Sequence, residues 1–207
     1  MSGASIEWYP GHSEAEQELE SRLSVLRAED TLRGLFFRSV QEALLALKEV
    51  GLEATEECDG GRRYVDFFAY PAGDFLRMLR RAARLMSGAA GGFEEAMRML
   101  GHLGTASFLA SPAGKAMDVL ISGAPRRVLE NLPASYKLTT PMGGPLSVVW
   151  LGPTSCRIIY TRDVLPRPYL QGTLEANLKK AGARGVRIEG RRLGPLASEY
   201  ELSWAAE

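Results

Sequence analysis

The chain has 207 residues, of which 45% are hydrophobic and 24% charged, and its formal net charge is zero. This composition is typical of a globular protein with a substantial core, and zero net charge without a zinc-knuckle or RNA-recognition motif argues against nucleic-acid binding. No stretch approaches the roughly 20 apolar residues that cross a bilayer, and the N-terminus lacks the features of a secretory signal. We therefore expect a cytoplasmic protein with no membrane partner. The two cysteines, Cys58 and Cys156, are predicted to be free thiols.

Charge is unevenly distributed along the chain. Residues 1–60 hold thirteen acidic and five basic side chains, whereas residues 61–207 hold twelve acidic and twenty basic ones. The two segments could attract each other within one molecule or between two molecules. An acidic surface helix on a mildly basic body is the simpler interpretation.

Helices are predicted throughout the first two thirds of the chain. Ser13 and Glu16 form a capping-box pattern, which predicts a helix from there to about residue 28. Asp30 and Thr31 can cap a second helix, whose apolar stripe ends at Gly51. The remaining elements expected in this part are an aromatic extended segment that Pro71 closes and helices over 75–86, 93–110, 117–122 and 125–132.

The last third is predicted to form strand, strand, helix, strand, strand. The four strands are expected over 145–152, 154–163, 185–192 and 198–204, with the helix over 166–181. A further strand is predicted over 136–140. Tight turns at Gly152-Pro153 and Gly194-Pro195 make the sheet largely antiparallel.

Helices come first and strands last, so the predicted fold class is α+β, with an N-terminal helical lobe followed by a mostly antiparallel four- to five-stranded sheet. We expect a single domain over 1–207. Its helical lobe spans 13–132, and its sheet lobe spans 134–204 with one covering helix. The other face of the sheet is then free for the helical lobe, for a partner or for a ligand.

The candidates for catalytic chemistry are few. The two histidines are His12 and His102, so a metal site, a Ser/His/Asp triad or a Cys/His pair would each depend on His102. The stretch SPAGKA over 111–116 lacks the glycine and the Ser or Thr of a phosphate loop. Cys156 lies on a predicted strand and is most simply a small core residue. We expect no catalytic residues and no metal site.

A basic stripe lies on the helix over 75–86. Arg77, Arg81 and Arg84 fall at helical spacing and could bind phosphate or an acidic partner helix, although a solvated face explains them as well. Methionines on this helix and the next could line an adaptable apolar pocket or simply pack in the core.

Six pieces of the chain resemble a conserved-hypothetical family that is largely restricted to myxobacteria. The pieces are EDTLRGLFF (29–37), YPAGDFLRML (70–79), LGHLGTASFLASPAGK (100–115), PRRVLENLPASY (125–136), PRPYLQGTLEANLKKAGARGVRI (166–188) and YELSW (200–204). The resemblance implies a family of unknown biochemical role.

More distantly, helices followed by strand, strand, helix, strand, strand are similar to four-vinyl-reductase and haem-NO-binding domains. That resemblance implies a module that binds small molecules or serves in sensing and assembly. In haem-binding members a histidine follows an Asn-Leu helix segment, but here Asn131-Leu132 is followed by Pro133, and Tyr136 stands near the expected position. Tyr160-Thr161-Arg162 is not the family's propionate-binding motif, and no cysteine follows Cys156. We therefore expect neither haem nor another cofactor.

Three hypotheses for function remain. The first is a non-catalytic module that senses a small apolar or amphipathic ligand between the helical lobe and the sheet, with His102, Phe108, Tyr136 and Trp150 as pocket residues. The second is a homodimeric protein-interaction adaptor in bacterial signalling or assembly, which makes contact through the sheet edge or the acidic first helix. An enzyme is the least favoured, since it would require a strongly perturbed His102 or Cys156 in a cleft.

Overall fold

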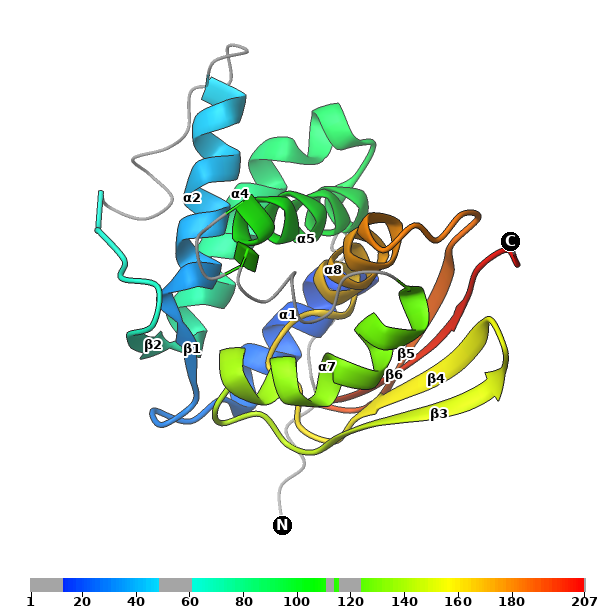
Figure 1. Ribbon diagram of the computed structural model, residues 1–207. Coiled ribbons are helices and arrows are strands. Elements are labelled where there is room, and N and C mark those ends of the chain that lie inside the picture. Colours follow the sequence, from blue (N-terminus) through cyan, green and yellow to red (C-terminus); the bar gives the residue numbers. More distant parts are fainter. Residues whose placement is uncertain (1–12, 49–60, 111–113, 116–123, 207) are drawn as a thin grey trace.

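The computed structural model describes residues 13–48, 61–110, 114–115 and 124–206 (Figure 1). The helices in this part of the chain are α1 (Glu14–Val25), α2 (Gly34–Lys48), α4 (Ala72–Ala90), α5 (Phe93–Ala110), α7 (Pro125–Thr139) and α8 (Arg167–Lys180). The strands are β1 (Thr31–Arg33), β2 (Ala69–Pro71), β3 (Leu146–Gly152), β4 (Ser155–Tyr160), β5 (Arg187–Gly194) and β6 (Ala197–Ser203). The α+β class is confirmed.

The four C-terminal strands form one antiparallel sheet in the order β3-β4-β6-β5. In the register, Cys156 pairs with Trp150 on one side and with Leu202 on the other, and Leu202 pairs with Ile188. The pattern strand, strand, helix, strand, strand is therefore confirmed, with α8 between β4 and β5. A second, two-stranded antiparallel sheet joins β1 to β2, where Leu32 pairs with Tyr70.

The helices of the described part of the chain lie on one side of the four-stranded sheet (Figure 1). On that side the side chains of Cys156, Ile158 and Tyr200 are completely buried. On the opposite face, Val149 is 47% exposed, and Arg157 forms an ion pair with Glu201. The helical part thus packs on the same face as α8, and no described element covers the other face.

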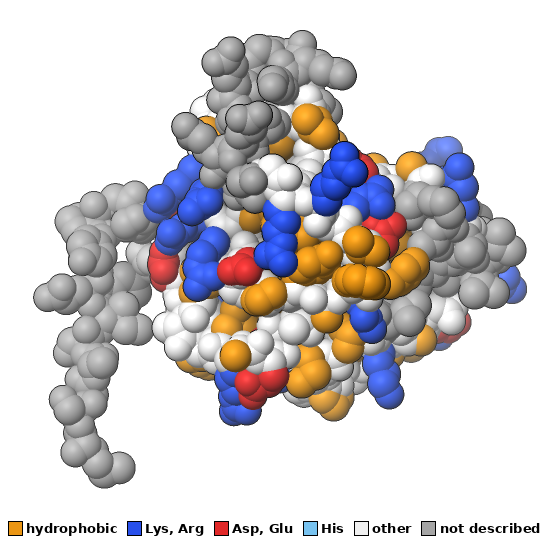
Figure 2. All heavy atoms as spheres, turned by 90° about the vertical axis from the view of Figure 1, so that its left-hand side faces the viewer, with side chains coloured by type: hydrophobic (Ala, Val, Ile, Leu, Met, Phe, Trp, Pro, Cys, Tyr) orange, Lys and Arg blue, Asp and Glu red, His pale blue; other side chains and the backbone are white. Residues whose placement is uncertain are grey.

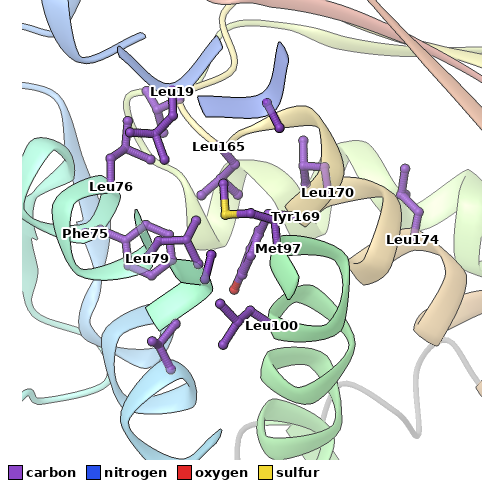
Figure 3. Packing of buried hydrophobic residues seen from close by; sticks show 14 of the residues in the cluster. Leu19, Phe75, Leu76, Leu79, Met97, Leu100, Leu165, Tyr169, Leu170 and Leu174 are labelled. Atoms are coloured by element: carbon purple, nitrogen blue, oxygen red, sulfur yellow. The ribbon is translucent and has the colours of Figure 1, made fainter. Parts of the chain in front are cut away.

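The main core lies where α1, α4, α5 and α8 meet, and α2 also contributes to it (Figure 3). Leu19 of α1, Leu79 of α4 and Leu100 of α5 are completely buried there. The ring of Phe75 on α4 meets the ring of Tyr169 on α8 edge-on, with 5.7 Å between the ring centroids. Helix α8 therefore connects the helical core to the sheet.

The first helix begins as the sequence predicts. The Glu16 amide donates to the Ser13 hydroxyl, and the Ser13 amide donates to the Glu16 carboxylate, each at 3.3 Å. The helix ends at Val25, slightly earlier than expected. Helix α4 begins at Ala72, three residues earlier than expected, so Asp74 lies in its first turn.

The additional strand predicted over 136–140 is wrong. Residues up to Thr139 continue α7, which also contains Pro133, so the sheet has four strands, at the lower end of the expected range. The Tyr136 hydroxyl donates to the Arg162 carbonyl at 3.1 Å, and its ring packs edge-on against Tyr160. This tertiary packing outweighs the strand propensity of the local sequence. The helix predicted over 117–122 lies outside the described residues.

The side of the molecule that carries α2, β1 and β2 has hydrophobic side chains interspersed with Lys and Arg (Figure 2). Phe67 and Phe68, just before β2, are 57% and 64% exposed. Arg33 donates to the Phe67 carbonyl at 2.6 Å. No helix in the described part of the chain is both long and apolar enough to cross a membrane.

Candidate functional site: an apolar cavity

A cavity of about 120 Å³ lies between the helical part and the sheet part of the chain. Its wall combines residues from α2, α5, α7 and α8 with the end of β4 and the loop that follows it. The apolar side chains of the wall are Leu35, Phe36, Phe108, Leu109, Val128, Leu132, Leu165, Leu170 and Leu174. Residues from both halves of the sequence therefore have to fold together to enclose this space.

Most polar groups of the wall are hydrogen-bonded to the backbone nearby. The hydroxyls of Thr105, Thr139 and Thr173 each donate to the carbonyl four residues earlier, at 2.9, 3.0 and 3.1 Å. The Asn177 amide donates to the Thr173 carbonyl at 2.8 Å, and the Tyr136 hydroxyl donates to the Arg162 carbonyl. Of the described residues that line the cavity, none is charged. The surface offered to a ligand is therefore mainly apolar.

Three tyrosines contribute to the wall, namely Tyr136, Tyr160 and Tyr169. Burial raises the pKa of each phenol well above its ordinary value, because water cannot solvate the phenolate. All three are uncharged at neutral pH. In this uncharged form they can offer hydrogen bonds.

Two of the four pocket residues predicted from sequence lie in this wall, Phe108 and Tyr136. His102 faces a different groove between α5 and α8, where its Nε2 lies 3.1 Å from a carboxylate oxygen of Glu175. Trp150 lies on β3, packs edge-on against Trp204, and has the Arg126 guanidinium 4.1 Å from its ring centroid. The structure thus brings Phe108 and Tyr136 together and places His102 and Trp150 elsewhere.

The arginines of the predicted basic stripe lie along α4. Arg77 pairs with Asp74 of the same helix at 2.9 Å. Arg84 pairs with Glu16 of α1 at 2.9 Å, and Arg81 is exposed. Another arginine of α4, Arg80, forms an ion pair with Glu20 of α1. The acidic helix opposite part of this stripe is therefore the chain's own α1. The role of Arg77, Arg81 and Arg84 in binding another protein stays a prediction.

Sequence reasoning missed the contributions of α2 and α8. Leu35 and Phe36 belong to an apolar stripe of α2 that is explained as well by ordinary core packing. One weak signal was available, since Ser39 and Gly104 are small residues within apolar helix faces. A Cβ atom on Gly104 would lie 3.0 Å from the Ser39 hydroxyl and 3.0 Å from the Tyr169 hydroxyl. These small residues let the helices approach closely beside the cavity.

The wall does not fit haem. No described lining residue is a histidine or cysteine that could ligate iron, or an arginine or lysine that could pair with propionates. The cavity of about 120 Å³ is also well below the roughly 300–1,000 Å³ of sites for drug-sized ligands. Among the described residues, no group of three or more His, Cys, Asp or Glu side chains could hold a metal ion.

Solved structures with a similar fold are H-NOX proteins. One from S. oneidensis is 10% identical with a TM-score of 0.64, and the alignment covers 85% of this chain and 97% of that one. One from K. algicida is 11% identical with a TM-score of 0.61, covering 85% and 98%. An oxygen-binding H-NOX domain related to soluble guanylate cyclases is 12% identical with a TM-score of 0.62, covering 84% and 96%. At these identities the likeness shows the fold, and it confirms the expected haem-NO-binding-like architecture.

The family of this chain follows from its amino-acid sequence. A family model described as protein of unknown function (DUF2378) matches residues 26–205, so the chain belongs to that family. No curated protein matches the chain in sequence. The expected membership of a family of unknown biochemical role is confirmed, whereas its restriction to myxobacteria stays a prediction.

Proposed function

We propose that the protein is a non-catalytic sensory or binding module for a small, uncharged, largely apolar molecule. The observation that carries this proposal is the cavity of about 120 Å³, with its apolar wall from α2, α5, α7 and α8. A cavity of roughly 150 Å³ lined by Leu, Ile and Phe stays dry and binds benzene or xenon, so a ligand of about that size fits here. The same fold carries a bound oxygen in one of the similar structures.

The chemistry of the wall supports binding over catalysis. Its titratable side chains are tyrosines that burial keeps neutral. Cys156 lies outside the wall, completely buried on the sheet, and burial raises the pKa of its thiol to about 11. His102 and Glu175 pair with each other in the other groove. No described group of the cavity is placed to act as nucleophile or as general base.

Native mass spectrometry of the freshly purified protein tests the proposal. We expect extra mass that disappears on denaturation, or uptake of benzene when it is supplied. Leu132→Trp should abolish both, because the larger side chain fills the cavity from α7. The matched control is Leu103→Trp on α5, where the leucine is 36% exposed and lies outside the cavity wall. A wild-type protein that carries no ligand and takes up no benzene would overturn the proposal.

A second candidate function is a homodimeric adaptor that pairs through the β3 edge. Strand β3 is an edge strand with no charged residue, and Val149 and Leu151 are 47% and 52% exposed. The opposite edge strand, β5, carries four charged residues, which discourage pairing. The acidic first helix is less suited to this role, since Glu16, Glu18 and Glu20 already pair with arginines of the same chain.

Sedimentation velocity over a range of protein concentrations tests this second candidate. We expect Val149→Lys to convert a dimer to a monomer, because a charge on the edge strand opposes pairing with a second copy. Leu193→Lys on β5 is the matched control and should leave the dimer intact. A wild-type protein that is monomeric at every concentration would exclude this candidate.

A further inference from the structure

The hydroxyl of Tyr160 differs from the other tyrosine hydroxyls of the cavity wall in its hydrogen bonding. Tyr160 lines the cavity and is only 1% exposed. Its hydroxyl has no hydrogen-bond partner in the described part of the chain, and its oxygen, unlike that of Tyr200, keeps some accessible surface. By contrast, the Tyr136 hydroxyl donates to the Arg162 carbonyl, and the Tyr169 hydroxyl is hydrogen-bonded to Ser39. Tyr160 is therefore the tyrosine of the wall whose hydroxyl is left for a partner inside the cavity.

The ring of Tyr160 is held firmly. Tyr136 packs edge-on against one part of it, with 5.0 Å between centroids, and Tyr200 packs edge-on against another, with 5.6 Å. Tyr160 is also the last residue of β4, so its backbone is fixed by the sheet. The hydroxyl cannot turn to another partner without breaking this packing. A ligand whose polar group reaches this hydroxyl would gain a hydrogen bond that the described residues do not supply.

Other polar groups near the cavity differ from the Tyr160 hydroxyl. The Tyr200 hydroxyl and one carboxylate oxygen of Asp163 also lack partners among the described residues, but neither residue lines the cavity. Ser135 and Asn177 line it, but both residues are only partly buried, and the Asn177 amide already donates to the Thr173 carbonyl. A ligand in the cavity would contact Tyr160 and leave Tyr200 and Asp163 untouched.

We infer that the ligand carries one hydrogen-bonding polar group, such as a hydroxyl or carbonyl, which engages the Tyr160 hydroxyl. The ligand class is then an uncharged aromatic or aliphatic molecule of about benzene size with a single polar end. A charged ligand is excluded from this class, because no described residue of the wall could pair with its charge. This inference rests on the proposed binding function and deepens it by naming the ligand class.

Calorimetric titration with phenol and with benzene tests the inference. Tyr160→Phe should weaken the binding of phenol about tenfold, the size expected when one net hydrogen bond is lost. The same change should leave the binding of benzene unaltered. Tyr200→Phe is the matched control, since it removes a neighbouring buried hydroxyl that does not line the cavity, and it should change neither affinity. The thermal midpoint of each variant shows that it is folded.

The possible results distinguish a failure of the Tyr160 assignment from a failure of the proposed binding function. If Tyr160→Phe leaves phenol binding unchanged while benzene binds all the variants, the assignment of Tyr160 is overturned and the binding function stands. If Tyr200→Phe weakens phenol as much as Tyr160→Phe does, the effect is not specific to the cavity wall and the inference is again overturned. If the wild-type protein binds neither probe, the binding function fails and the inference fails with it.

Discussion

Arg22 of α1 is completely buried and joins three parts of the chain. Its guanidinium donates to Glu18 at 2.9 Å, to the Ser198 hydroxyl at 2.8 Å and to the backbone carbonyl of Asp163. Glu18 in turn accepts from Arg167 at 3.0 Å. Because these charges are out of contact with water, each depends on the others for compensation. The network fixes α1 to the start of α8 and to the sheet.

Removing Arg22 should therefore destabilise the protein strongly. We expect Arg22→Ala to lower the free energy of unfolding by about 3–5 kcal/mol, because it leaves the buried Glu18 carboxylate without its partner in α1. Arg77→Ala removes an exposed ion pair with Asp74 and should cost less than about 0.5 kcal/mol. Urea denaturation measures both. Equal effects of the two substitutions would show that the buried network is not a main source of stability.

Asp163 gives the stability a pH dependence of known sign. Burial raises the pKa of its carboxyl from 3.8 to about 7. The folded protein therefore binds a proton at this site that the unfolded chain releases between pH 4 and 7, so the site's stabilising contribution is present below pH 4 and is lost as the pH rises to 7. The slope approaches about 1.4 kcal/mol per pH unit.

Asp163→Asn isolates this dependence. Asparagine keeps an oxygen that can accept the Leu165 amide, which the native carboxylate accepts at 3.0 Å, but it does not titrate. We expect the wild-type protein to lose stability relative to Asp163→Asn as the pH rises from 4 to 7. Denaturant unfolding at several pH values measures the difference. Parallel curves for the two proteins would contradict the assigned pKa shift.

At the scale of the elements, helices α5 and α8 approach each other closely. A Cβ atom on Gly101 of α5 would lie 2.1 Å from the Tyr169 carbonyl oxygen, and one on Gly172 of α8 would lie 2.0 Å from the Arg98 carbonyl oxygen. Each glycine thus admits the backbone of the other helix. Both helices contribute to the cavity wall, so this contact also sets the width of the cavity.

Glycine substitutions should have opposite effects at two helical positions. Gly101→Ala should destabilise the protein by about 1–3 kcal/mol, since the new methyl group forces the helices apart. Gly88→Ala on α4 meets nothing within 4 Å and should stabilise by up to about 1 kcal/mol through helix propensity. Thermal unfolding of both variants gives the two signs. A neutral Gly101→Ala would show that the two helices do not pack so closely.

The elements that could be predicted from sequence are those with local signals. The capping box at Ser13 and the turns at Gly152 and Gly194 set the start of α1 and the hairpins of the sheet. The end of α7 could not be predicted, because Tyr136 is held in the helix by its contacts with Arg162 and Tyr160, which are distant in sequence. Only the folded chain brings these partners together.

The cavity itself was beyond sequence reasoning for the same reason. Its wall needs Leu35 of α2, Phe108 of α5, Leu132 of α7 and Leu174 of α8 at once, and no local pattern distinguishes a wall residue from an ordinary core residue. His102 and Trp150 are predicted from their residue type, but neither lines this space. Phe108 and Tyr136 do line it, and their role in binding a ligand stays a prediction.

For the whole molecule, the uneven charge along the chain finds partners within one chain. Asp30, which follows α1, pairs with Arg162 at 2.6 Å, and Arg167 pairs with Glu14 and Glu18 of α1 at 2.8 and 3.0 Å. These pairs hold the acidic N-terminal part against the sheet part. Of the two ways in which the segments could attract each other, attraction within one molecule is present.

Xenon binding in a crystal tests the central claim most directly, since xenon occupies apolar cavities without needing a particular hydrogen bond. We predict anomalous density for xenon between Phe108, Leu132 and Leu174 in the wild-type protein, and its loss in Leu132→Trp. A pressurised wild-type crystal without xenon at this place would contradict the account that the fold encloses a binding cavity there.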